Sequence, residues 1–244
     1  MALKFWSKLE SASDITSPQI GTAGVLQGTP PYNPCKFNNG MEANNGVEGF
    51  LLPVAGNAIT VDKGTVEFWF KPFFLPTDAG YHDIIYGFGV RRIRIYFSNV
   101  SNNFNVDIGA GPSLIITSIT WSINDLIHFG ITWDKDGNDI GGGKTVAIYI
   151  DNVLEDSSIV TWTSGALSAN LQIGWRDASY YAEGIIDNLK FYEECKTDFS
   201  DKEDEDAGAP PPPSAKTLVQ AALISAVPLV AIPTLAQIAK ITGS

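Results

Sequence analysis

The sequence predicts an all-β fold, an antiparallel two-sheet jelly-roll sandwich that is followed by an acidic, proline-rich linker and a C-terminal apolar tail. Three observations support this prediction. Short segments alternate between apolar and polar residues, clusters of Gly, Asn and Asp separate them, and no long amphipathic helix precedes residue 214. Many short strands in one long domain are typical of sandwiches and jelly rolls. A chain of 244 residues can hold one such domain.

Four segments show the period-two alternation of half-buried antiparallel strands. They are TVEFWFK (65–71), RRIRIYF (91–97), HFGITWD (128–134) and TVAIYID (145–151). One face of each segment is apolar, so we expect these faces to form the core together with part of the segment 183–194. The expected core residues are Val66, Phe68, Phe70, Ile93, Ile95, Phe129, Ile131, Trp133, Val146, Ile148, Leu189 and Phe191.

Composition divides the chain into three parts. Residues 1–198 carry the strand pattern and form the predicted sandwich domain. Residues 199–214 form the predicted linker, because a block of like charges repels itself and the four prolines at 210–213 favour an extended spacer. Residues 215–244 form an apolar tail for anchoring or assembly.

The tail has no charged residue between Lys216 and Lys240, and its uncharged run 217–239 is long enough to span a bilayer as a helix. Pro228 and Pro233 interrupt this run, and each removes a backbone hydrogen-bond donor. The tail therefore either crosses a membrane or packs into an apolar groove of other structural proteins, in an assembly where this protein is oligomeric. We favour the assembly alternative, because a free apolar tail would otherwise aggregate.

The formal net charge of −11 argues against a nucleic-acid partner, because phosphate binding depends on clustered Lys and Arg. The basic cluster at residues 91–94 places Arg92 and Arg94 at strand spacing. We interpret this cluster as a solvated strand face.

Five segments carry a family resemblance through their order along the chain. They are TVEFWFKP (65–72), HFGITWD (128–134), TVAIYIDNVLEDSS (145–158), NLQIGW (170–175) and EGIIDNLKFYEE (183–194). Together they resemble the concanavalin A-like lectin/glucanase superfamily, and within it the LamG-like (laminin-G/pentraxin-type) jelly-roll domains. The earlier segment CKFNNGMEA (35–43) resembles a strand of the same family. The resemblance covers residues 1–195 and implies two antiparallel sheets, a concave face and a binding role more often than a catalytic one.

Two polar residues of the strand pattern have structural interpretations. In IIDNLKFY (185–192), Asp187 shares its parity with Leu189 and Phe191, so the pattern places it toward the core. A buried carboxylate must accept hydrogen bonds, and we expect backbone N–H groups of a neighbouring loop to donate them. His128 has no nucleophile paired with it, and we interpret it as a sheet residue.

We expect no enzymatic activity and no catalytic residues. The resemblance implies that glucan-cleaving members of this fold carry acids in the pattern E-x-D-x-x-E, and this sequence lacks that pattern. His82 and His128 are the only histidines, and the sequence has neither HExxH nor a P-loop.

The loop DKDGNDIGGG (134–143) offers carboxylates at Asp134, Asp136 and Asp139 around Gly137, as acidic calcium loops do. Its order differs from that of an EF-hand, since Gly is at the fourth position and no Glu closes the loop. A polar, Gly-rich hairpin between two strands needs no metal. We therefore expect no cofactor, with calcium at residues 134–139 as the alternative.

Aromatic residues outside the core pattern provide a candidate glycan-binding site. The segment GWRDASYYAEG (174–184) gathers Trp175, Arg176, Asp177, Tyr180 and Tyr181. Planar rings for stacking, beside a charged pair for hydrogen bonding, are what a sugar site requires. The alternative is that Trp175 and one tyrosine cap the end of the sandwich.

The two cysteines, Cys35 and Cys195, leave open whether a disulfide joins the first and last parts of the domain. Terminal strands are often neighbours in sandwiches of this kind. Assembly in the cytosol favours free thiols instead.

The N-terminal segment carries charges at Lys4, Lys8 and Glu10 and lacks the apolar region of a secretory signal. LamG-like domains without such signals are frequent among phage surface proteins, which leave the cell by lysis. We therefore expect a non-enzymatic virion structural protein of a bacteriophage, displayed on the virion surface in the extracellular medium for decoration or attachment. The alternative is a cell-surface or membrane-anchored lectin or adhesin.

Overall fold

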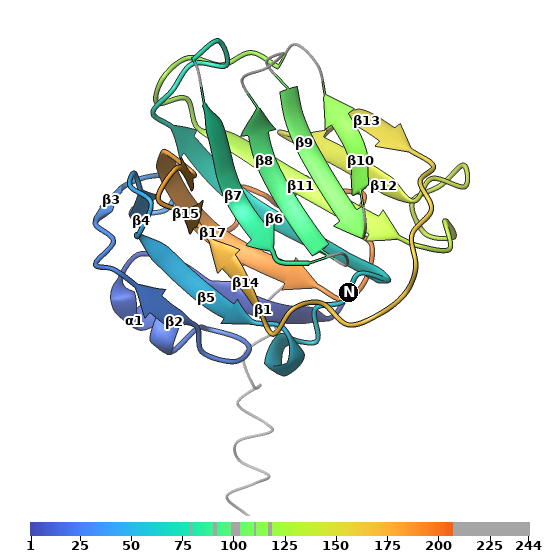
Figure 1. Ribbon diagram of the computed structural model, residues 1–244, viewed down its shortest axis with the longest axis horizontal. Coiled ribbons are helices and arrows are strands. Elements are labelled where there is room, and N and C mark those ends of the chain that lie inside the picture. Colours follow the sequence, from blue (N-terminus) through green and yellow to red (C-terminus); the bar gives the residue numbers. More distant parts are fainter. Residues whose placement is uncertain (79, 90–91, 99–102, 110, 117–118, 207–244) are drawn as a thin grey trace, which may run out of the picture. The chain divides into compact units, whose positions relative to one another are not determined.

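The computed structural model describes residues 1–206, except residues 79, 90–91, 99–102, 110 and 117–118 (Figure 1). Contacts divide the chain into two units, Met1–Ala209 and Pro210–Ser244. The predicted tail, residues 215–244, and the proline run at 210–213 lie outside the described residues. Among the helices that are described, none has the length and apolar character needed to cross a membrane.

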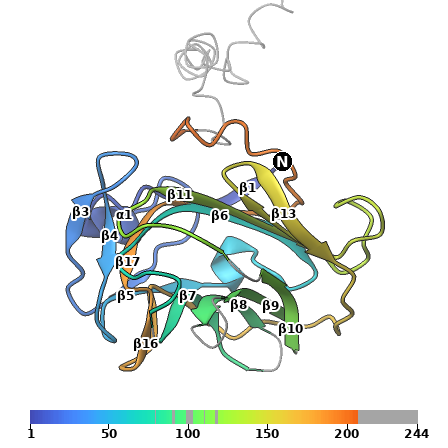
Figure 2. The same ribbon diagram turned by 90° about the horizontal axis from the view of Figure 1, so that it is seen from above.

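Two antiparallel sheets form the sandwich and face each other as layers in Figure 2. We call the eight-stranded layer sheet A and the seven-stranded layer sheet B. The strands of sheet A are, in spatial order, β13 (Val153–Ser158), β12 (Val146–Ile150), β11 (Ile127–Asp134), β6 (Lys63–Pro72), β17 (Gly184–Tyr192), β4 (Asn39–Ala43) and β3 (Tyr32–Pro34), with β1 (Leu3–Ser7) paired to β17.

Sheet B and three small elements complete the fold. The strands of sheet B are, in spatial order, β10 (Gly111–Ile116), β9 (Asn103–Gly109), β8 (Arg92–Ser98), β7 (Tyr81–Gly87), β14 (Asn170–Ile173), β5 (Gly49–Pro53) and β2 (Val25–Gln27). Helix α1 (Ala12–Thr16), the short 3-10 helix η1 (Ala55–Asn57) and a separate hairpin of β15 (Trp175–Asp177) and β16 (Tyr180–Tyr181) lie outside the two sheets. The predicted all-β jelly-roll sandwich is confirmed.

The core lies between the two sheets and consists of the apolar faces that the alternation predicts. None of the twelve expected core residues is more than 1% exposed. Aromatic rings cross from one sheet to the other: Phe104 of β9 stacks on Phe129 of β11 at 4.7 Å, and Phe129 stacks on Phe68 of β6 at 5.6 Å. The buried indole of Trp133 donates its N–H to the carbonyl of Thr60 at 3.0 Å, so this polar atom is satisfied. The predicted core is confirmed.

Asp187 lies on the outer face of sheet A, and its predicted position toward the core is wrong. A register shift between Asp187 and Lys190 in β17 reverses the parity, so Asp187 lies opposite Trp69 while Phe191 lies opposite the core residue Val66. The predicted partner is confirmed, because the Phe37 N–H donates to Asp187 Oδ2 at 2.8 Å. A bulge of this kind changes the face of a side chain without changing the sequence pattern.

The pH dependence of stability should report the environment of Asp187. Burial, opposed by the Phe37 N–H and reinforced by nearby acids, raises the pKa of Asp187 to about 7. The folded state therefore holds a proton that the unfolded state loses between about pH 4 and pH 7, so the stabilising contribution is full below pH 4 and is lost as the pH rises to 7. Relative to Asp187→Asn, the free energy of unfolding of the wild type should fall over this range by at most about 4 kcal/mol. Guanidinium titrations at pH 4, 5.5 and 7 measure the difference, and a constant difference would contradict the raised pKa.

Residues 195–206, which we call the strap, cross the outer face of sheet A (orange in Figure 2). Phe199 is fully buried, and its ring covers Gly130 so closely that a Cβ there would lie 2.4 Å from the ring. The Trp69 indole donates to the carbonyl of Lys202 at 3.2 Å. Residues 199–206, the first part of the predicted linker, thus pack against the sandwich.

Lysines of the domain explain why the acidic strap docks instead of repelling itself. Lys8 pairs with Glu205 at 2.7 Å, and Lys36 pairs with Glu203. These partners lie far from the strap in the sequence, and the fold brings them to its path. The ion pairs with these lysines offset the repulsion among the acids of the strap, and the buried Phe199 ring adds apolar contact.

Beneath the strap, Glu67 of β6 is the centre of a buried network of charged and polar groups. Its carboxylate accepts the Tyr192 hydroxyl at 2.6 Å and the Lys196 ammonium at 2.9 Å, and the Lys190 Nζ lies 4.0 Å away. His128 lies in β11, as predicted, with Nε2 3.8 Å from Glu67. Burial and nearby lysines lower the pKa of His128 to about 3, so this imidazole is neutral at pH 7.

The two cysteines are both free thiols and do not pair with each other. The Cys195 thiol donates to the carbonyl of Trp133 at 3.2 Å. Burial and the neighbouring carboxylate of Asp187 raise the pKa of Cys35 to about 12. Both sulfur atoms are therefore protonated at neutral pH and weak nucleophiles.

Candidate functional site

The predicted glycan-binding segment folds into the hairpin of β15 and β16, which lies beside β7 of sheet B (Figure 1). Its residues do not form one cluster. Arg176 and Tyr180 face each other, with the guanidinium carbon 4.6 Å from the ring centre, and exposed Asp177 approaches Arg176 at 3.6 Å. Trp175 packs at Gly49, where its ring would be 2.6 Å from an added Cβ, and half-buried Tyr181 pairs with Trp175 in the hairpin.

Trp175 therefore fits the alternative interpretation, in which an aromatic residue caps the sandwich. Arg176 and Tyr180 instead join side chains that project from sheet B. The predicted residues therefore have two roles. Trp175 packs at Gly49, whereas Arg176 and Tyr180 contact tyrosines that project outward from sheet B.

Alternation along β7 and β8 places a second group of polar and aromatic residues on the outer face of sheet B. In β8, Ile93, Ile95 and Phe97 are buried in the core, so the alternate residues Arg94 and Tyr96 face outward. The register pairs Arg94 with Tyr86 of β7, and cross-strand partners share a face.

Six side chains form a closed ring on this face, which we call the Tyr–Arg ring. Its members are Tyr81, Tyr86, Arg94, Tyr96, Arg176 and Tyr180. The distances around the ring, taken between ring centres or from guanidinium carbon to ring centre, are Tyr96–Arg94 3.7 Å, Arg94–Tyr86 5.8 Å, Tyr86–Arg176 5.0 Å, Arg176–Tyr180 4.6 Å, Tyr180–Tyr81 5.7 Å and Tyr81–Tyr96 6.4 Å. Cations over aromatic faces and edge contacts between rings hold such planes in fixed orientations.

Two buried carboxylates support the arginines of this face. Asp83 is fully buried and accepts two hydrogen bonds from Arg94, at 2.5 and 3.0 Å. Asp107 of β9 accepts one from Arg92 at 2.8 Å. Burial raises the pKa of Asp83 and of Asp107, and the arginines oppose that rise. The bidentate Arg94–Asp83 pair fixes the guanidinium plane against Tyr96.

Further atoms around the ring suit a polar ligand with apolar faces. Phe88, which directly follows β7, is 71% exposed, and its ring lies 6.5 Å from that of Tyr86. Arg92 Nε, Asp107 Oδ1 and Asn103 Oδ1 are buried, and among the residues that the structure describes they have no hydrogen-bond partner. Exposed rings for stacking, beside donors and acceptors that are still free, are the chemistry of sugar recognition.

Sequence reasoning missed Tyr81, Asp83, Tyr86 and Tyr96, and it interpreted Arg92 and Arg94 as a solvated face. Both arginines are in fact half-buried and paired with buried carboxylates. The available signal was the identity of the outward residues: Tyr and Arg alternate with the core residues of β8, where a merely solvated face would carry Lys, Thr or Ser. The partners of this row lie on other strands, so the sequence did not indicate a ring.

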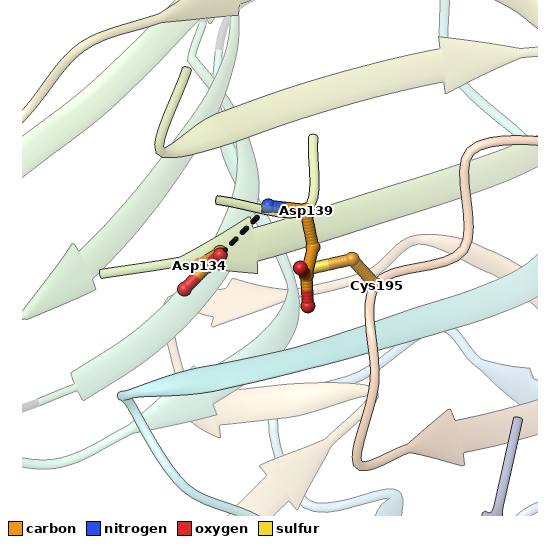
Figure 3. Close-up of side chains that lie close together, drawn as sticks. All are labelled: Asp134, Asp139 and Cys195. Atoms are coloured by element: carbon orange, nitrogen blue, oxygen red, sulfur yellow. Dashed lines mark hydrogen bonds between the residues drawn. The ribbon is translucent and has the colours of Figure 1, made fainter. Parts of the chain in front are cut away.

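The acidic loop has the geometry of a structural hairpin. Figure 3 shows Asp134 and Asp139 close to Cys195. Asp134 is buried, and its carboxylate accepts the N–H groups of Asn138 at 2.8 Å and Asp139 at 3.0 Å, while the ammonium of Lys63 pairs with Asp139 at 2.5 Å. Asp136 is turned to its neighbour Lys135.

This donor set does not fit calcium. The ion prefers six to eight oxygen ligands, whereas here a lysine supplies the positive charge and a thiol is the third ligand candidate. Burial raises the pKa of Cys195, which keeps this thiol protonated. Hydrogen bonds and lysine pairs within and beside the loop already satisfy the carboxylates of Asp134, Asp136 and Asp139.

Comparison with known proteins places this architecture in a family. Residues 45–198 match the family described as the concanavalin A-like lectin/glucanases superfamily. Among curated proteins, no match to the sequence was found. Among solved structures, the chain is similar to domain 4 of AbnA, an extracellular arabinanase from Geobacillus stearothermophilus in complex with arabinotriose, with a TM-score of 0.58, 18% identity and coverage of 80% of this chain and 93% of that one.

Two further structures share the fold across part of a longer chain. The binding domain of botulinum neurotoxin serotype D has a TM-score of 0.60, 13% identity and coverage of 80% of this chain and 49% of its own. Trypanosoma rangeli sialidase has a TM-score of 0.56, 17% identity and coverage of 80% and 31%. This protein thus spans about half of the first and a third of the second, and at these identities the similarity shows the fold alone. The family match, the two-sheet topology and the confirmed core lead to one conclusion: the chain belongs to the concanavalin A-like lectin/glucanases superfamily.

Proposed function

We propose that this protein is a non-enzymatic carbohydrate-binding module and that its glycan ligand stacks on the Tyr–Arg ring. The observation that carries the proposal is the closed ring of four tyrosines and two arginines on the outer face of sheet B. Sugar rings present flat C–H faces to aromatic planes and hydroxyl groups to fixed donors and acceptors. The similarity to an arabinanase domain solved with arabinotriose is consistent with this role.

The chemistry of the carboxylates near the ring favours binding over hydrolysis. Glycoside hydrolysis uses one carboxylic acid as the proton donor and a second carboxylate as nucleophile or base. Asp83 and Asp107 are instead buried and occupied by Arg94 and Arg92. Carboxylates held in this way orient guanidinium groups and are not free to attack or protonate a sugar.

Replacing Tyr86 and Tyr180 together with alanine should abolish or strongly weaken glycan binding. Each ring contributes about 0.5–1.5 kcal/mol of stacking, so the pair should raise the Kd roughly 5- to 150-fold. Binding on a glycan array, followed by calorimetry on the best ligand, measures the loss. The matched control is Tyr86→Phe with Tyr180→Phe, which keeps both rings and should keep most of the affinity.

Trp175→Ala separates the two interpretations of the hairpin. Because Trp175 packs at Gly49, its loss should lower the thermal midpoint and leave glycan affinity nearly unchanged. Unchanged binding by the double alanine variant, or loss of binding by Trp175→Ala at full stability, would show that the ligand lies elsewhere.

We further propose that residues 215–244 hold the domain on a virus particle, most simply a bacteriophage virion, as an attachment or decoration protein. The described chain ends at Asp206 on the outer face of sheet A, where Glu205 and Asp206 approach Lys8. The Tyr–Arg ring lies on the outer face of sheet B, on the other side of the sandwich. The last described residue thus lies on the side of the sandwich opposite the ring, which supports display of the ring away from the particle.

The chain ending at residue 214 tests this role. It should be folded and soluble, bind glycan like the full chain and fail to join the particle. If the full-length protein instead floats with liposomes and resists carbonate extraction with no partner present, the tail is a membrane anchor and the protein is a membrane-anchored lectin or adhesin.

A further inference from the structure

We propose that the Tyr–Arg ring selects electrically neutral oligosaccharides and discriminates against acidic ones such as sialylated, uronic or sulfated glycans. This inference rests on the proposed function and adds the chemical class of its ligand. It is carried by the pairing of charges at the ring and by the kind of polar atoms that remain unpaired there.

Charges at the ring cancel among the residues that the structure describes. The two arginines of the ring and Arg92, which lies two residues from Arg94 in β8, each have a carboxylate partner. The pairs are Arg94 with Asp83, Arg92 with Asp107 and Arg176 with Asp177. A site for acidic sugars has unpaired cations, because a carboxylate or sulfate needs a counter-charge when it leaves water. Arg94 and Arg92 already donate to buried aspartates, and the partly exposed Arg176 has the carboxylate of Asp177 3.6 Å from its Nε.

The geometry of the arginines supports the same conclusion. Arg94 uses Nε and Nη2 for Asp83 and lays its guanidinium plane 3.7 Å from the centre of the Tyr96 ring. Arg176 lies over Tyr180 and within 5.0 Å of the Tyr86 ring centre. Both guanidinium groups therefore act as planes in a stacking surface. In Arg94, the pair of N–H groups that could bind an anion is already occupied by Asp83.

The unpaired atoms match hydroxyl groups. Within the described part of the chain, Asp107 Oδ1 and Asn103 Oδ1 are acceptors without a partner, and Arg92 Nε is a donor without one. The side chain of Arg92 is 30% exposed and pairs with Asp107, whose side chain is 2% exposed. Sugar hydroxyls both donate and accept, so different hydroxyl groups of an oligosaccharide can pair with acceptors and with donors. A carboxylate or sulfate only accepts, so it cannot donate to an unpaired acceptor, and the negative charge of Asp107 repels it.

The electrostatic field of the whole chain also disfavours acidic glycans. Its net charge of −11 repels anionic glycans at long range, most strongly at low ionic strength. Recognition of a neutral sugar by stacking and hydrogen bonding does not depend on this field. Its affinity should therefore change little with salt.

Calorimetry with the full-length chain tests the inference on matched ligand pairs, each a neutral oligosaccharide and the same oligosaccharide carrying one carboxylate or sulfate. We expect the added acid to raise the Kd at least fivefold at 50 mM NaCl. The Kd of the neutral ligand should change less than twofold between 50 and 500 mM NaCl. Acidic ligands that bind tighter, with an affinity that salt weakens, would overturn the inference and leave the proposed function standing. No binding of either class at the ring would overturn both.

Two variants test the charge compensation directly. Asp177→Asn removes an exposed carboxylate beside Arg176, and this exposed position carries no risk to folding. Asp83→Asn keeps the shape of the buried partner of Arg94 and leaves its charge uncompensated. Each variant should lower the ratio of the Kd of the acidic ligand to the Kd of the neutral ligand at least threefold. The control Asp156→Asn, on the exposed edge strand β13, should leave this ratio unchanged. An unchanged difference in both ring variants would contradict the role of charge pairing.

Discussion

Replacing Glu67 with alanine is expected to lower the free energy of unfolding by about 3–5 kcal/mol, because the variant leaves two lysines buried without their counter-charge. Glu67 and both lysines are at most 3% exposed. The carboxylate accepts the Tyr192 hydroxyl at 2.6 Å and the Lys196 ammonium at 2.9 Å, and it faces Lys190 at 4.0 Å. Lys196 keeps a second partner, Asp201 at 2.8 Å, but that carboxylate is half exposed and a weaker counter-charge.

Urea or guanidinium denaturation followed by tryptophan fluorescence measures this loss. Glu67→Gln keeps the shape and an acceptor for Tyr192, so it should cost less than the alanine variant and separate charge from packing. Glu155→Ala, on the exposed strand β13, is the matched control and should change stability by less than about 0.5 kcal/mol. A cost below 1 kcal/mol for Glu67→Ala would mean that the network beneath the strap is hydrated.

Replacing Phe199 with alanine is expected to release the strap from sheet A. The ring is fully buried, covers Gly130 and lies 5.1 Å from the ring of Tyr149. Truncation of a buried phenylalanine costs about 3–5 kcal/mol, which is comparable with what the partly exposed ion pairs beyond Phe199 can supply, whereas Lys196 stays held by its buried pair with Glu67. The strap should therefore open locally beyond Lys196 while the sandwich stays folded.

Hydrogen exchange distinguishes local from global opening. Amides of residues 199–206 should lose protection in Phe199→Ala, whereas amides of β6 and β11 should keep theirs. Phe199→Leu retains most of the apolar contact and should keep the strap protected. Equal loss of protection in the strap and in β11 would mean that the strap and sandwich unfold as one unit.

Local periodicity in the sequence determined the layers of the fold. In 65–71 and 91–97, every second residue is apolar, and this pattern leaves one face available for burial. The core residues Phe68 and Ile95 follow from that pattern without knowledge of their partners, and the order of such segments along the chain carried the family resemblance. These are properties of each segment alone.

Asp187 shows the limit of this reasoning within a single strand. The sequence IIDNLKFY alternates in a way that places Asp187 on the apolar face. The register shift between Asp187 and Lys190 instead puts the Asp187 carboxylate on the outer face of sheet A. A bulge depends on how β17 pairs with β6, and the sequence of β17 does not contain that information.

The candidate site and the strap depended on contacts between distant segments. Arg176 and Tyr180 were visible as a possible sugar site, but the ring needs Tyr86 and Arg94, which β7 and β8 place beside the hairpin. The acids of the strap indicated repulsion because the lysines that pair with them, Lys8 and Lys36, belong to the other end of the chain. The sequence by itself determined which faces are apolar, since burial of a strand face is a local property. Only the tertiary structure decided which charged and aromatic side chains meet on the outer faces, because their interaction energies depend on distances that the fold alone sets.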